Sequence, residues 1–155
     1  MDQILDTLQT EKTQFKYAGF GDRLVAAIID SIILWVVNAI ISFAFVGSAV
    51  VNSSDINSGT IVTMVVMYIV LLAVNFGYFA GMESSARMAT IGKSAMGLRV
   101  CDMNGERISF GKATGRYFGK IVSSIILGIG YLMVIWSDKK QALHDQMAGT
   151  LVLKK

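Results

Sequence analysis

Two long apolar stretches dominate the pattern of the chain, at residues 24–46 and 60–82. The first contains a single charged residue, Asp30, and the second contains none. A helix of either length is about 34 Å long, enough to cross a hydrocarbon core of roughly 30 Å. The apolar side chains of the first stretch outweigh the insertion cost of one central Asp. The pattern therefore predicts two membrane-spanning helices joined by a short polar loop at 47–59.

A third apolar stretch, residues 121–136, is short for a span and contains Gly128 and Gly130. It predicts one of two arrangements. In the first, the stretch crosses the membrane as a third span. In the second, the chain turns at the two glycines, so that residues 110–127 enter as one helix and 131–148 return as another.

The positions of Lys and Arg favour the helical hairpin over the third span. Three precede the first span, none lies in the loop between the spans, seven lie within 83–120 and four follow residue 136. Loops rich in Lys and Arg stay in the cytoplasm. We therefore expect the N-terminal tail, residues 1–16, in the cytoplasm together with 83–120, and only the hairpin keeps the C-terminal charges there too.

The polar segment 83–109 contains a signal for a small β-hairpin. Asn104-Gly105 lies between the short β-prone runs 97–102 and 106–108. Asn-Gly favours a two-residue turn because both turn positions need positive φ. The fold expected for residues 1–155 is thus a single all-α transmembrane bundle with a small cytoplasmic β-hairpin.

Composition narrows the function further. The chain has 155 residues, a mean hydropathy of +0.57, a net charge of +3, no Pro, one Cys and one His. This excludes disordered proteins, disulfide scaffolds and a Cys/His metal site within one chain. No nucleophile and base occur at a recognisable spacing. We expect no metal, no cofactor, no nucleic-acid partner and no enzymatic activity.

Arg23 and Asp30 are seven residues apart, so they share one face of the first predicted span, and Asn38 extends that polar face. An ionisable residue inside a membrane suggests a functional site. Asp30 is therefore a candidate ligand for a proton or small cation. The alternative is a structural ion pair that holds helices together.

His144 and Asp145 form the other candidate pair. Adjacent side chains on a helix point about 100° apart, so these two do not form a site by themselves. Asp145 is expected to meet a partner elsewhere, such as Arg23 or Arg116. His144 beside an acid suggests a proton relay, although a structural role for both residues is the stronger expectation.

Small and basic residues recur at helical spacing. Two sets of glycines predict close helix contacts within or between subunits, and hence a homo-oligomer: Gly77 and Gly81, and Gly111, Gly115 and Gly119. A basic stripe beside the second set predicts either contact with anionic lipid headgroups or a solvated face: Lys112, Arg116 and Lys120.

Five short motifs, in this order and spacing, resemble the RDD family of small prokaryotic membrane proteins. They are YAGFGDRL from residue 17, TIGK from 90, GLRV from 97, LHD from 143 and AGT from 148. The resemblance covers residues 17–153. It assigns the Arg and the two Asp that name the family to Arg23, Asp30 and Asp145, with Asp138 the weaker candidate for the last.

The resemblance implies a multi-pass protein of the prokaryotic cell membrane. The function of the family is largely undefined, with a suggested role in transport of small ligands, including cation/proton exchange. We therefore expect a transport-linked protein that uses an intramembrane Arg/Asp site. The alternative is a membrane scaffold or interaction module in which these residues are structural.

Overall fold

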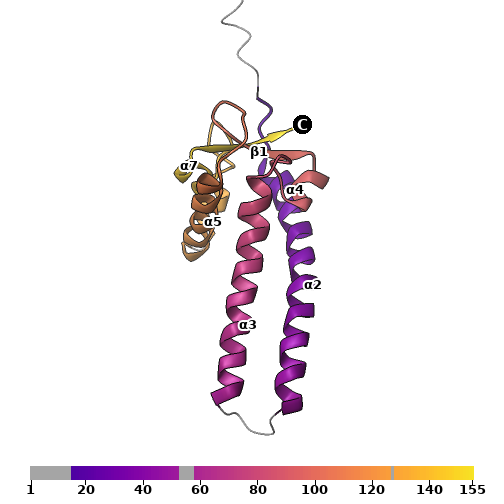
Figure 1. Cartoon of the computed structure of the whole chain (residues 1–155). Coiled ribbons are helices and arrows are strands. Elements are labelled where there is room, and N and C mark those ends of the chain that lie inside the picture. Colours follow the sequence, from indigo (N-terminus) through magenta and orange to yellow (C-terminus); the bar gives the residue numbers. More distant parts are fainter. Residues whose placement is uncertain (1–14, 53–57, 127) are drawn as a thin grey trace, which may run out of the picture.

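The computed structural model describes residues 15–52, 58–126 and 128–155 (Figure 1). The predicted N-terminal tail, residues 1–16, lies almost entirely outside the described residues. The middle of the predicted 47–59 loop also lies outside them.

Two long helices run side by side along most of the molecule (Figure 1). The first is α2, and the second is α3 followed by the π-helix η1; their bounds are Phe20–Asn52, Ser58–Phe76 and Gly77–Gly81. The parts long and apolar enough to cross a membrane are Phe20–Gly47 and Ser58–Gly81. These coincide with the two predicted spans to within four residues at each end.

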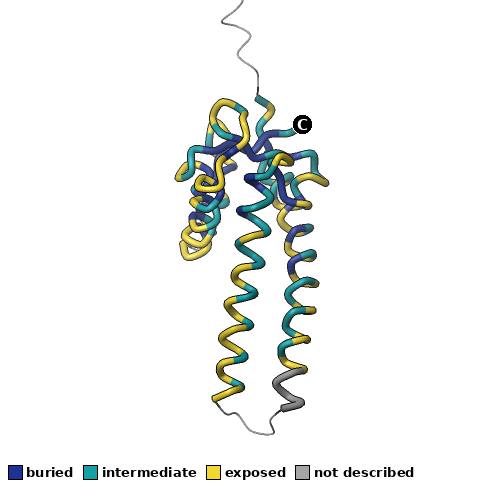
Figure 2. Tube along the Cα trace, viewed as in Figure 1, coloured by how far each residue is buried: buried dark blue, intermediate teal, exposed yellow. Residues whose placement is uncertain are grey.

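Few residues of these two helices are buried, and many are exposed (Figure 2). The bulky apolar side chains of Trp35 and Phe43 are 72% and 83% exposed. Exposed apolar surface of this extent needs a lipid or protein partner. The hydrocarbon core of a bilayer around α2 and α3 would cover this surface.

All remaining elements gather at one end of the two long helices, and we call described residues 82–155 the cap (Figure 1). Its elements are α4 (Ile91–Ala95), β1 (Leu98–Asp102), α5 (Phe110–Ile125), α6 (Ile129–Leu132), α7 (Leu143–Met147) and β2 (Thr150–Lys154). A small apolar core holds the cap to the start of α2, and it includes Ala18, Ala26, Leu98, Val100 and Val152.

The two strands of the cap come from distant parts of the chain. β1 pairs antiparallel with β2, from Leu98 opposite Lys154 to Asp102 opposite Thr150. On its other edge β2 bonds the segment before α2, where the Ala18 amide donates to the Val152 carbonyl at 2.9 Å. β2 therefore ties the N-terminal segment to β1.

The predicted β-hairpin of 97–102 with 106–108 is wrong in its pairing. A single bridge joins Cys101 to Arg107, and the ladder of β1 is made with β2 instead. Of the two turn residues, only Gly105 has positive φ, at 86°. The Asp102 carboxylate accepts from the Asn104 and Glu106 amides, at 2.9 and 3.0 Å. This local side-chain turn replaces the two-residue turn that a regular hairpin needs.

Residues 121–136 form no continuous helix. Helix α5 ends at Ile125, and the chain reverses at Gly128, whose φ is 75°. The returning limb contacts α5 closely, since a Cβ on Gly130 would lie 2.6 Å from the Ser123 hydroxyl. The chain therefore turns back near the two glycines, as the predicted helical hairpin requires, and does not continue as a third span. The return helix predicted over 131–148 is wrong, because only the short helices α6 and α7 form there.

The predicted glycine contacts differ from one position to the next. A Cβ on Gly119 would lie 2.9 Å from the Cβ of His144, so α5 and α7 approach closely there. A Cβ on Gly77, Gly81 or Gly115 would meet no described atom within 4 Å. Gly119 is the member of the predicted sets that permits tight packing within the chain.

Gly92 makes the tightest backbone approach, between α4 and α2. A Cβ there would lie 2.2 Å from the Ala26 carbonyl oxygen and 2.8 Å from the Asp30 carboxylate. We predict that Gly92→Ala lowers the free energy of unfolding by about 2 kcal/mol or more, through overpacking. Gly115→Ala is the matched control, and it should leave stability unchanged or raise it by up to about 1 kcal/mol. Thermal unfolding in detergent measures both, and equal stability of the two variants would contradict the prediction.

Candidate functional site

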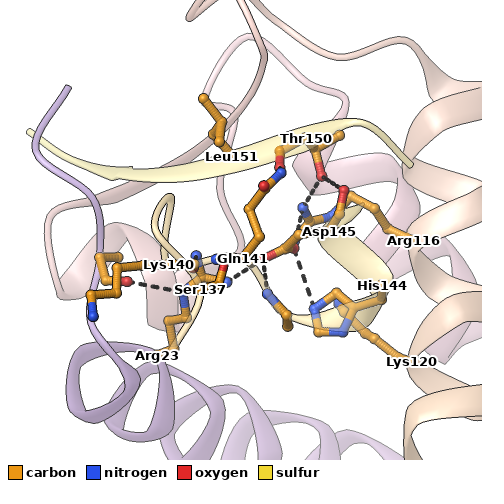
Figure 3. Close-up of polar contacts among 12 residues, drawn as sticks. Arg23, Arg116, Lys120, Ser137, Lys140, Gln141, His144, Asp145, Thr150 and Leu151 are labelled. Atoms are coloured by element: carbon orange, nitrogen blue, oxygen red, sulfur yellow. Dashed lines mark hydrogen bonds and ion pairs between the residues drawn. The ribbon is translucent and has the colours of Figure 1, made fainter. Parts of the chain in front are cut away.

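A buried carboxylate, Asp145, joins three elements of the structure (Figure 3). Arg23 from α2 pairs with one of its oxygens, and Nη1 of Arg116 from α5 lies 2.6 Å from the other. Asp145 itself lies on α7, where its carboxylate also accepts from the Ala142 amide at 3.1 Å. This last bond fixes the carboxylate at the first turn of α7. The sequence-based expectation that Asp145 meets Arg23 or Arg116 is confirmed for both.

Glu83 forms a second centre in the same network. Its carboxylate forms ion pairs with Lys93 at 2.5 Å, Arg116 at 2.9 Å and Lys120 at 3.1 Å. Arg116 therefore bridges Glu83 and Asp145, and its side chain is 1% exposed. It also donates to the Thr150 hydroxyl at the start of β2. One guanidinium thus connects α5 to η1's C-terminal end, to α7 and to the sheet.

Both carboxylates of the network are held in their charged form. Burial alone would raise the pKa of Asp145, but Arg116 and Arg23 outweigh it and hold that pKa well below its usual range. Lys120, Lys93 and Arg116 overcome the same burial effect at Glu83, so its pKa is also well below the ordinary value. Neither group exchanges a proton near neutral pH.

His144 is neutral in this environment. Burial lowers its pKa to about 3, although Asp145 acts in the opposite direction. Its Nε2 lies 3.4 Å from an Asp145 oxygen, and its ring packs against Tyr131 with centroids 5.4 Å apart. A neutral histidine between packed groups fits the structural expectation rather than the proton relay.

Asp30 lies outside this network, in the first span, and Arg23 does not pair with it. Its carboxylate accepts from the Tyr78 hydroxyl at 2.6 Å, the Thr90 hydroxyl at 2.6 Å and the Gly92 amide at 2.7 Å. Asp30 is 2% exposed. Among the described residues no Lys, Arg or His forms an ion pair with it. Asp30 is thus a buried carboxylate held by neutral donors.

The structure separates Asn38 from the other candidate residues. Its side-chain oxygen accepts from the Asn75 side-chain amide at 3.1 Å, which joins the two spans further along α2.

The predicted basic stripe of Lys112, Arg116 and Lys120 is also divided by the structure. Lys112 is exposed, whereas Arg116 and Lys120 belong to the network around Glu83. The three residues therefore do not form one exposed basic face.

A cavity of about 420 Å³ lies between α2 and the helices of the cap. Charged and polar side chains reach it from several elements, and they include Arg23, Asp30, Lys93, Arg116, Lys120 and His144. Apolar side chains such as Leu24, Phe79 and Val134 form the rest of its wall. The cavity is the place where Asp30 and the cations of the network face a common space. In the described part of the chain, no three His, Cys, Asp or Glu residues are grouped to hold a metal ion.

Four residues around these sites were not singled out from the sequence: Tyr78, Glu83, Thr90 and Lys93. Glu83 could have been identified from the sequence, because it is a lone acid directly after an uncharged span and is followed by several Lys and Arg residues. Thr90 and Lys93 lie in the TIGK motif, which contributed to the family resemblance without an assigned role. Tyr78 gave no signal, since its hydroxyl reaches Asp30 only through the packing of η1 on α2.

We predict that Glu83→Gln destabilises the protein by about 3 kcal/mol or more, because it leaves three cations without their shared partner. The control is Glu106→Gln, since Glu106 is exposed. Exposed substitutions of this kind change stability by roughly 0.5 kcal/mol or less. Thermal unfolding of both variants at neutral pH tests this, and a similar loss in both would refute it.

His144 also predicts a pH dependence of stability. Its pKa is about 3 in the fold and 6.5 in the unfolded chain, so between these values only the unfolded chain binds the proton. Stability should therefore fall on acidification below pH 6.5, by about 1.4 kcal/mol per pH unit. His144 is the one histidine of the sequence. Unfolding measured from pH 6.5 to 5 should show this slope in the wild type and a flatter one in His144→Gln; equal slopes would contradict the assignment.

Comparison with known proteins places this architecture among relatives whose function is not described. The chain is 34% identical to the uncharacterized protein YxaI of Bacillus subtilis over 151 residues, which cover 90% of this chain and 99% of that protein. It is 28% identical to the uncharacterized membrane protein YteJ of the same organism, over 94% of this chain and 85% of that one.

A third relative matches only in part. The proline-rich antigen of Mycobacterium leprae is 34% identical over 80 residues, which cover 51% of this chain and 30% of that protein. No solved structure matches the chain. The profile of the RDD family matches residues 17–149, nearly the whole described chain. Together with its two apolar spanning helices, this match shows that the chain is a membrane protein of the RDD family.

Proposed function

We propose that this membrane protein is a transport component, rather than an enzyme, that exchanges a proton or small monovalent cation at Asp30. The observation that carries the proposal is the environment of Asp30. It is buried in a spanning helix, has no cationic partner among the described residues and lines the cavity. A carboxylate in this position is neutralised only when a proton or cation binds it.

The immediate surroundings of Asp30 supply further oxygen atoms. The hydroxyls of Tyr78 and Thr90 both donate to the carboxylate, and each oxygen retains lone pairs. Small hard cations prefer such oxygen ligands. Tyr78 lies on the π-helix η1, and π-helical turns in α-helices often occur at functional sites. A local change at η1 would alter the donors around Asp30.

In this proposal Arg23 and Asp145 have a different role from Asp30. They hold α2 to α5 and α7 through a buried ion pair and are therefore positioning residues. The proposal puts the cap on the cytoplasmic side of a prokaryotic cell membrane, which the distribution of Lys and Arg and the family resemblance support. Two spans per chain enclose no pathway, so transport requires a homo-oligomer in which the exposed faces of α2 and α3 meet.

A scaffold or interaction module is the second candidate function. It is favoured by the buried network of Arg23, Arg116, Glu83 and Asp145, whose charges are all paired. Such a network holds the cap in one arrangement, and its two carboxylates have pKa values well below their usual range. In this case Asp30 would also be structural, as a hydrogen-bond acceptor between α2, η1 and α4.

Proton-coupled cation flux in liposomes separates the two functions. We predict that the wild type exchanges protons for at least one of Na⁺, K⁺ or Li⁺, and that Asp30→Asn reduces the flux at least tenfold. The matched control, Asp138→Asn, changes an exposed carboxylate of the cap and should retain full flux. Thermal unfolding of each reconstituted variant shows that it remains folded.

Two results would contradict transport at Asp30. Unchanged flux in a folded Asp30→Asn variant would exclude Asp30 as the exchanging group. Absence of flux from the wild type, with a smaller oligomer in Asp30→Asn by size-exclusion chromatography, would support the scaffold function instead.

A further inference from the structure

The cavity between α2 and the cap carries an excess of positive charge. Four cations line it: Arg23, Lys93, Arg116 and Lys120. Their ion-pair partners Glu83 and Asp145 lie behind the lining, and the carboxylate among the lining residues is Asp30. His144 is neutral because burial lowers its pKa to about 3. All four cations have an ion-pair partner, but four cations against three carboxylates leave a net charge of +1 around the cavity.

Lys93 and Lys120 also have hydrogen-bonding capacity that the described chain does not use. Both ammonium groups contact the same Oε1 atom of Glu83, at 2.5 and 3.1 Å. An ammonium has three N–H donors, and no second hydrogen-bond acceptor is found for either group among the described residues. Lys120 additionally lies 4.2 Å from the centre of the Phe79 ring. Several donors therefore remain for an anion at the cavity.

The surroundings of the cavity are apolar on the outside. Helix α5 buries Arg116, Gly119 and Ser123. Large apolar side chains of α5 and α6 are exposed: Phe118, Ile121, Val122, Ile125 and Ile129. On the other side, the cavity is bounded by α2 as far as Ser31, well inside the first span. The cavity thus combines charged lining residues with nearby exposed apolar surface, beside the first part of a spanning helix.

We propose that this cavity binds the phosphate headgroup of an anionic membrane lipid, with Lys93 and Lys120 as its principal donors. The acyl chains extend along the apolar outer surfaces of α2 and α5. The volume of about 420 Å³ is in the range of small-molecule sites. Burial and the neighbouring cations lower the pKa of Lys93 to about 8, and a bound phosphate would favour its charged form.

This site shares the cavity with Asp30 but uses different groups from the proposed transport. Lipid binding requires the lysines and the open cavity, whereas transport requires the Asp30 carboxylate. Asp30→Asn should therefore retain the lipid, and loss of flux in that variant would leave the lipid site intact.

The test is native mass spectrometry of the purified full chain in detergent, titrated with phosphatidylglycerol or with phosphatidylcholine of the same acyl chains. We predict at least tenfold tighter binding of phosphatidylglycerol. Glycerol phosphate, which lacks acyl chains, should neither bind at the same concentration nor compete. Equal binding of the two lipids would overturn the proposal, and effective competition by glycerol phosphate would show a site for free phosphate compounds instead.

Two lysines on α5 give a matched pair of variants. Lys120→Gln removes a donor at the cavity and should weaken phosphatidylglycerol binding about tenfold, equivalent to about 1.4 kcal/mol. Lys112→Gln removes the same charge from an exposed position on the same helix and should leave binding unchanged. Equal effects of the two variants would show nonspecific attraction and overturn the assignment.

A third variant covers the case in which Lys120→Gln fails to fold. Ala27→Leu fills the cavity from α2 without changing any charge, because Ala27 lines it. It should abolish the preference for phosphatidylglycerol while thermal unfolding stays unchanged. Full binding by this variant would place the lipid elsewhere on the protein.

Discussion

The interaction on which the rest of the structure depends is the contact of Arg116 with two buried carboxylates, Glu83 and Asp145. A charge as deeply buried as this guanidinium is tolerated only when it is paired and hydrogen-bonded. Because the carboxylates come from the end of the second span and from α7, the requirement fixes where the cap lies on the membrane helices. Arg23 extends the same network to the first span. The two long helices and the cap are therefore one unit, held together by buried ion pairs rather than by a large apolar core.

How far the sequence predicts this fold depends on the range of each signal. The spans are visible because a run of apolar residues is a local property, and the reversal at Gly128 follows from a glycine pair inside a short apolar stretch. The pairing of β1 with β2 joins segments about fifty residues apart, so the local Asn-Gly signal gave the wrong partner. In the site, Arg23, Asp30 and Asp145 were identified by composition and family resemblance. The separate surroundings of Asp30 and Asp145, and the central position of Glu83, depend on packing that no short motif encodes.

Asp30 and Asp145, the two aspartates assigned by the family resemblance, therefore have different physical environments. Asp145 is surrounded by guanidinium groups that keep it charged, and it connects helices. Asp30 is surrounded by hydroxyls and an amide, which satisfy its oxygens without cancelling its charge. The fold thus has an end held by ion pairs beside a buried carboxylate that has no ion-pair partner among the described residues.

The position of β2 between the N-terminal segment and β1 has a consequence for biogenesis. During translation both spans emerge before Thr150–Lys154 exist, so Arg23 reaches the membrane while its partner Asp145 is still unmade. Insertion of the helical pair and closure of the cap are then separate events in time, as expected when distant segments must meet. Until β2 is made, the N-terminal segment and β1 lack the strand that joins them. A product shortened before Thr150 would therefore keep both long helices but could not close the cap in this arrangement.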